Sequence, residues 1–146
     1  MDQLPFLPIG QQHFASVRSP NTIYVDKTEH IFRLCYPHKG YYFLSRPRRF
    51  GKSLTLDTIH ELFNGNRELF KGLWIEDKWD WSQIHPVIRL SLDAIGHKED
   101  SLVPALKTAL RDIAKRFGIR LDKKSPGSMF AELIGALMVK TGKQVV

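Results

Sequence analysis

The stretch that decides the expected fold is Tyr41-Tyr42-Phe43-Leu44-Ser45-Arg46-Pro47-Arg48-Arg49-Phe50-Gly51-Lys52-Ser53-Leu54. It reads as a short apolar strand, a tight basic loop, and a helix that opens at Gly-Lys-Ser. This order of elements is the context that a phosphate-binding P-loop requires. The match to the pattern G-x-x-x-x-G-K-[ST] is incomplete, because Arg46 stands where the pattern has its first glycine. The other interpretation is a basic turn between a strand and a helix.

The residue types of this loop suit the binding of phosphate. Gly51 would let the backbone approach phosphate oxygens, and the N–H groups at the start of the helix would point at the anion. Lys52 would neutralise the β- and γ-phosphates, and the Ser53 hydroxyl would hold Mg²⁺. The sequence therefore predicts a nucleotide site, with Ser53 as the metal ligand, formed by Arg48, Arg49, Phe50, Gly51, Lys52, Ser53 and Leu54.

The composition is that of a soluble globular protein. The chain has 146 residues, 42% hydrophobic and 25% charged, which is enough for one domain with a core. No run of about 18 apolar residues predicts a membrane span, and the start lacks the pattern of a secretory signal. The single cysteine, Cys35, fits a reducing cytoplasm and a small core residue better than a nucleophile. The net charge of +7 favours polyanionic partners.

The periodicity alternates between strands and helices. Asp26 and Glu29 have the spacing of a capping box for a helix that runs to about Tyr36. Further elements are predicted as a helix after the loop to about residue 64, a strand over 86–93, helices over 101–117 and 126–141, and the start of a strand at 144. This order predicts an α/β fold, P-loop NTPase-like, with three layers and a parallel sheet. We expect a leader with a capping helix over 1–40 and a partial P-loop core over 41–146.

Several segments resemble the predicted AAA-ATPase-like family of bacteria. The resemblance rests on Tyr24-Val25-Asp26-Lys27-Thr28, on the string Arg46-Pro47-Arg48-Arg49-Phe50-Gly51-Lys52-Ser53, on Glu68 to Leu73, on Pro86 to Leu90, and on Gly142 to Val146. It covers nearly the whole chain, and in that family arginine at the position of Arg46 is usual. The resemblance implies an ATPase module in which Lys52 and Ser53 serve ATP and Mg²⁺. Family members commonly carry a C-terminal nuclease-like domain.

The resemblance also implies that the Walker B strand, with its acidic pair, would follow Val146. We therefore expect an N-terminal fragment with weak or no hydrolysis by itself, whose partner is a missing C-terminal half or a second copy. Missing strands would leave open sheet edges, so we expect the isolated chain to be marginally stable or to self-associate. Asp93, at the end of a strand-like run, is an alternative metal-orienting carboxylate, although a turn-capping aspartate is commoner.

A different class of function competes with nucleotide binding. A basic patch of Arg46, Arg48, Arg49 and Lys52 lies among the aromatic residues Tyr41, Tyr42, Phe43 and Phe50. Such a patch can bind single-stranded nucleic acid by phosphate neutralisation and stacking. The aromatics fall in a predicted buried strand, which argues against this alternative; a structural remnant that binds nothing is a third possibility. Asp57 and Glu61, one turn apart after the loop, are predicted to lie on a solvated helix face. The scattered histidines predict no zinc site.

Overall fold

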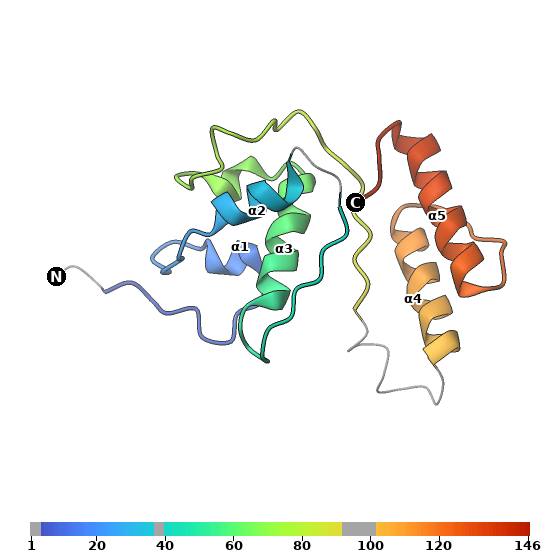
Figure 1. Ribbon diagram of the computed structural model, residues 1–146, viewed down its shortest axis with the longest axis horizontal. Coiled ribbons are helices and arrows are strands. Elements are labelled where there is room, and N and C mark those ends of the chain that lie inside the picture. The colour runs from blue at the N-terminus through green and yellow to red at the C-terminus, as the bar shows by residue number, and fades with distance from the viewer. Residues whose placement is uncertain (1–3, 37–39, 92–101) are drawn as a thin grey trace. The chain divides into compact units, whose positions relative to one another are not determined.

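The computed structural model describes residues 4–36, 40–91 and 102–146, and the elements in these ranges are helices (Figure 1). They are α1 (Phe14–Val17), α2 (Thr28–Cys35), α3 (Lys52–Phe63), the 3₁₀ helix η1 (Arg67–Phe70), α4 (Leu102–Arg116) and α5 (Pro126–Thr141). The chain divides into two compact units between Ile84 and His85. The predicted division into 1–40 and 41–146 stays a prediction.

The prediction of a three-layer fold with a parallel sheet is wrong. No β-strand occurs in the ranges that the structure describes, and residues 41–44 and 86–91 are not paired into a ladder. The β-type contacts there are an isolated parallel bridge between Phe6 and Thr22, and a pair of hydrogen bonds at Val146. Val146 N–H donates to the Pro86 carbonyl at 2.9 Å, and the Val146 carbonyl accepts from Ile88 N–H at 2.8 Å. A strand needs a partner along its length, and apolar composition alone does not supply one.

The first unit is built around a core that α1, α2, α3 and η1 share. Aromatic rings dominate it: Phe14 and Phe70 are fully buried, with their ring centroids 4.8 Å apart. The buried members are Phe14, Ile31, Leu62, Phe70 and Ile75, and Cys35, Trp79 and Trp81 are among the partly buried residues packed on them. Trp79 and Trp81 therefore serve largely as core packing. Burial also raises the pKa of the Cys35 thiol to about 11.

Helix α2 begins two residues after Asp26, so the predicted capping box is wrong in detail. The N-cap is Lys27, and Glu29 pairs with Arg33 at 2.6 Å instead of reaching back. The Asp26 carboxylate accepts hydrogen bonds from Thr28 N–H at 2.8 Å and from Trp74 N–H at 2.7 Å. Burial alone would raise the pKa of Asp26, but these hydrogen bonds outweigh it and lower the pKa below its ordinary value. Asp26 thus joins the start of α2 to the segment after η1.

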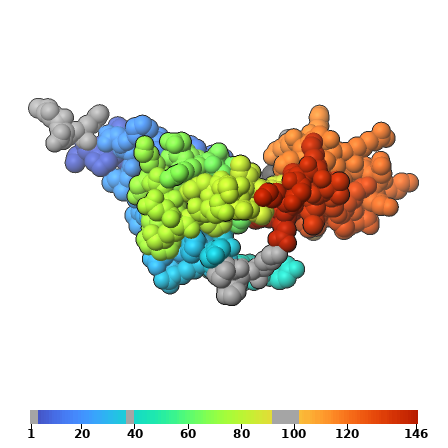
Figure 2. Space-filling view, turned by 90° about the horizontal axis from the view of Figure 1, so that it is seen from above, coloured from blue at the N-terminus to red at the C-terminus, as the bar shows by residue number. Residues whose placement is uncertain are grey.

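The second unit is a helical hairpin of α4 and α5. Ser125 caps α5, since its Oγ accepts from Ser128 N–H at 3.2 Å, and Pro126 occupies the first turn, as the sequence predicts. Its buried residues are Leu110, Ile113, Ala114, Met129, Leu133 and Leu137. In Figure 2 the orange and red atoms of this unit form one continuous packed body. None of the helices described is both long and apolar enough to cross a membrane.

Candidate functional site: the loop before α3

The loop over residues 46–51 reverses the chain immediately before α3 (Figure 1). Two of its residues have left-handed backbone conformations, Arg49 with φ of 65° and Gly51 with φ of 77°. Gly51 is the N-cap of α3, and no atom lies within 4 Å of where a Cβ would stand. Glycine is favoured at position 51 because the backbone there is left-handed, and not because a larger side chain would clash. Turns that combine left-handed residues orient successive N–H groups and form concavities suited to anions.

The side chain of Lys52 folds back into this loop. Its ammonium donates hydrogen bonds to the carbonyl oxygens of Arg46 and Pro47, the second at 2.8 Å. The structure therefore places the charged group of Lys52 on the inside of the turn, where the sequence predicts that it meets phosphate.

The start of α3 offers hydrogen-bond donors at the same place. Thr55 N–H and Thr55 Oγ1 both donate to the Gly51 carbonyl, at 2.9 and 3.0 Å, and close the first turn. In the part of the chain that the structure describes, no acceptor is bonded to the N–H groups of Lys52, Ser53 and Leu54. The first N–H groups of a helix have no partner within the helix and carry its positive dipole end. Ser53 is exposed beside them.

The segment that precedes the loop differs from its prediction. Residues 40–50 are all exposed, so the aromatic residues expected in a buried strand lie on the surface. Arg46, Arg48 and Arg49 are exposed as well, and within residues 4–36, 40–91 and 102–146 none of them forms an ion pair with a carboxylate. The structure thus brings together the loop residues 48–54, but it provides no sheet edge beneath them.

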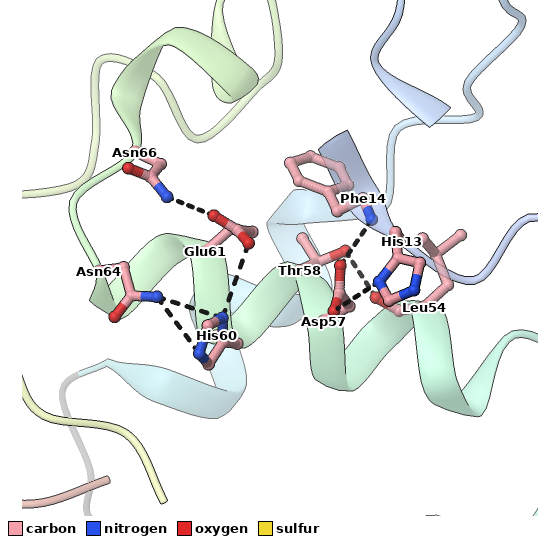
Figure 3. Close-up of polar contacts among 9 residues, drawn as sticks. All are labelled: His13, Phe14, Leu54, Asp57, Thr58, His60, Glu61, Asn64 and Asn66. Carbon is pink, nitrogen blue, oxygen red and sulfur yellow. Dashed lines mark hydrogen bonds and ion pairs between the residues drawn. The ribbon is translucent and has the colours of Figure 1, made fainter. Parts of the chain in front are cut away.

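Figure 3 shows that the two acidic residues of α3 have structural partners, which corrects the prediction of a solvated face. Asp57 is only 5% exposed, and its Oδ2 accepts from Phe14 N–H at 2.6 Å. His13 Nδ1 lies 3.6 Å from Oδ1 of the same carboxylate. Glu61 accepts a hydrogen bond from Asn66 Nδ2 and lies 3.6 Å from His60 Nδ1. Sequence periodicity did not indicate these roles, because they depend on α1 and on the turn after α3.

The described ranges contain no group of three or more His, Cys, Asp or Glu side chains that could hold a metal ion. Between Glu29 and Asp57 the sequence has no acidic residue at all. The Asp57 carboxylate is occupied by the start of α1. Asp93, the alternative metal-orienting carboxylate, lies outside the described residues. A metal ion at the loop would therefore depend on Ser53 and on oxygens that a ligand brings.

Comparisons with known proteins point to one family. A relative from Azotobacter chroococcum mcd 1, named "Uncharacterized protein in vnfD 5'region", is 42% identical over 142 residues. That alignment covers 96% of this chain but 27% of the relative, so the chain spans about a quarter of the relative's length. No solved structure matches the chain significantly. The model of a family described as "Predicted AAA-ATPase" matches residues 8–146, and the chain therefore belongs to this AAA-ATPase-like family.

Proposed function

We propose that the chain binds a nucleoside triphosphate, ATP as the family description suggests, through the loop and the start of α3. The observation that carries the proposal is the position of Lys52, whose ammonium lies inside the loop on the carbonyls of Arg46 and Pro47. A cation held in this loop is a suitable partner for phosphate oxygens, as are the first N–H groups of α3, for which the described residues supply no acceptor. The backbone of Arg48 to Leu54 would surround the phosphates, and Lys52 would bridge them.

Magnesium would be held by Ser53 together with phosphate oxygens of the nucleotide. Mg²⁺ commonly binds through few protein groups and keeps several waters, so one hydroxyl is a reasonable contribution from the chain. Bound there, the ion would neutralise phosphate charge.

Binding, with weak or no hydrolysis by this chain alone, is the activity that these residues favour. Phosphoryl transfer depends on carboxylates that orient the metal ion and the attacking water. The described loop has none beside it, and Asp57, the first acidic residue after it, caps α1.

The test is calorimetric titration of the purified chain with Mg-ATP, beside the variant Lys52→Ala. Loss of a hydrogen-bonded charge from a phosphate contact is expected to weaken binding roughly 10- to 150-fold. The matched control is Lys71→Ala, which removes the same charge from an exposed position in the same unit. Chelation of Mg²⁺ should also weaken binding, and Mg-GTP in place of Mg-ATP reports base preference.

Two outcomes would refute the proposal. The first is the absence of saturable binding by a chain that circular dichroism shows to be folded. The second is binding that Lys52→Ala and Lys71→Ala weaken equally, since this would mean that net charge, and not the loop, attracts the nucleotide.

A further inference from the structure

The exposed segment over residues 41–50 has a one-sided arrangement of aromatic rings. It runs from Gly40 to Pro47 without a helix, turn or bend (Figure 1). Tyr41 is fully exposed and Phe43 is 93% exposed, whereas Tyr42 and Leu44 are 58% and 43% exposed. This alternation is that of an extended chain, in which residues i and i+2 point the same way. Tyr41 and Phe43 therefore share the outer face, and in Figure 2 the cyan atoms of this part of the chain lie at the rim of the first unit.

The spacing of these two rings suits a stacked base. Residues i and i+2 of an extended chain are about 6.6 Å apart, from a rise of about 3.3 Å per residue. That separation is about twice the 3.4 Å rise per nucleotide of a stacked strand. One unpaired base can therefore lie between the rings of Tyr41 and Phe43 or against either one. Phe50, which is 62% exposed on the loop, offers a third ring.

The sequence that surrounds these rings carries only positive charges. From residue 30 to residue 56 the sequence has six Lys or Arg residues and no Asp or Glu, so this stretch accounts for +6 of the net charge of +7. Arg46, Arg48 and Arg49 are exposed, and in the described part of the chain no carboxylate pairs with them. A polyanion would gain these three guanidinium groups without breaking an ion pair.

We propose that residues 41–50 form a binding surface for single-stranded nucleic acid, in which Tyr41, Phe43 and Phe50 stack on bases and Arg46, Arg48 and Arg49 contact phosphates. Exposed rings interleaved with cations are the combination by which proteins bind unpaired strands with little sequence preference. A duplex keeps its bases stacked inside and offers the rings nothing, so single strands are favoured. The surface shares Arg48, Arg49 and Phe50 with the proposed nucleotide site, whereas Tyr41, Phe43 and Arg46 belong to this surface alone. The substitutions of Tyr41 and Phe43 therefore separate the two proposals.

The test is fluorescence anisotropy of a labelled 15-nucleotide oligo-dT with the full chain, titrated over a range of NaCl concentrations without Mg²⁺. With three phosphates neutralised, log K is expected to fall with log [NaCl] with a slope of about −2, from about −0.7 per contact for single strands. The variant Tyr41→Ala/Phe43→Ala is expected to lose at least about tenfold in affinity with an unchanged slope, because stacking does not release counterions. Arg46→Gln/Arg48→Gln/Arg49→Gln should remove most of the slope.

Matched controls distinguish binding at this surface from non-specific electrostatic and hydrophobic binding. Lys115→Gln/Lys123→Gln/Lys124→Gln removes the same charge from exposed positions of the second unit, and Phe130→Ala removes an exposed ring there. Neither should change affinity more than about twofold. Lys52→Ala, which is expected to weaken nucleotide binding, should leave the stacking contribution intact. Tyr41, Phe43, Arg46, Arg48 and Arg49 are all exposed, so the variants at these positions are expected to melt as the parent chain does.

Several results would overturn the proposal. Equal binding of a 15-base-pair duplex, or no effect of Tyr41→Ala/Phe43→Ala, would show that stacking on this surface does not occur. Equal losses in the two charge variants would show that net charge, and not this surface, attracts the strand. A dimer on sizing that Phe43→Ala dissociates would assign the surface to a second copy. Partition onto phosphatidylcholine–phosphatidylserine vesicles through the same rings, without oligonucleotide binding, would assign it to a lipid surface.

Discussion

Asp57→Ala is the substitution that most directly tests how the first unit is held together. The Asp57 carboxylate accepts the N–H of Phe14, the first residue of α1, in a buried setting. Alanine removes the acceptor, and the Phe14 ring, which is fully buried, keeps water from replacing it. A buried donor that loses its charged partner costs about 1–3 kcal/mol. His13 is 76% exposed, so its pairing with Asp57 adds little.

The expected loss of stability is about 2 kcal/mol, after the better helix propensity of alanine offsets about 0.5 kcal/mol. The 84 residues of the first unit carry an unfolding entropy of about 0.18 kcal/mol/K, which converts this loss to about 11 °C in Tm. If all 146 residues unfold together, the shift is about 6–7 °C. Asp57→Asn keeps an acceptor oxygen and loses only the charge, so its cost is expected to be about half.

The assay is thermal unfolding at pH 7 followed by circular dichroism and calorimetry. Asp77→Ala is the matched control, since it removes a carboxylate from an exposed position of the same unit. The reasoning is refuted if Asp57→Ala melts within 2 °C of the parent chain, or if Asp57→Asn costs as much as Asp57→Ala. The second result would mean that the charge, and not the acceptor for α1, is what stabilises the unit.

Three further predictions test other parts of the first unit. With a pKa of about 11, only about one part in a thousand of the Cys35 thiol is thiolate at pH 8. Cys35 should therefore react slowly with a disulfide reagent until urea unfolds the chain. Rapid stoichiometric labelling of the folded chain would contradict this. Because the folded pKa of Asp26 is lowered, its stabilisation is present above the unfolded value of about 3.9 and is lost as the pH falls through the folded value. Asp26→Asn should therefore cost about 1 kcal/mol at pH 7 in denaturant melts, and this cost should shrink as the pH falls below about 3.9. A cost that stays constant into acid would be evidence against this account. Gly65→Ala should destabilise the first unit by more than the approximately 1 kcal/mol expected of Gly51→Ala. Both glycines have positive φ, but only at Gly65 would a Cβ meet the Ile84 side chain, at 2.9 Å. Equal melting temperatures of the two variants would refute this.

The elements that the sequence predicts correctly are those whose signals are local. Ser125 and Pro126 start α5 and Gly142 ends it with φ of 65°, because caps and positive-φ positions depend on residues within one turn. The end of α3 before Gly65 is predicted for the same reason. The helical assignment of α5 holds even though some of its apolar residues, such as Met138, are exposed.

The errors concern contacts between distant residues. The apolar run at Tyr41 to Leu44 has high β-propensity, but propensity does not supply a partner strand, and in the described ranges none pairs with it. Asp57 was assigned to solvent because nothing near it in sequence shows that α1, 43 residues earlier, begins at its carboxylate. The residues of the candidate loop were predictable from Gly51-Lys52-Ser53, whereas the inward fold of Lys52 onto the Arg46 and Pro47 carbonyls was not.

The backbone of Arg49 implies a conflict between folding and binding. A side chain at φ of 65° is disfavoured relative to glycine by a few tenths to about 1 kcal/mol, even after the greater freedom of glycine in the unfolded chain is counted. No ion pair within the described ranges compensates for that strain. Arg49→Gly should therefore raise the melting temperature while it lowers affinity for anions. If both changes are measured, the left-handed backbone at Arg49 is a cost to folding that the chain bears for the sake of binding.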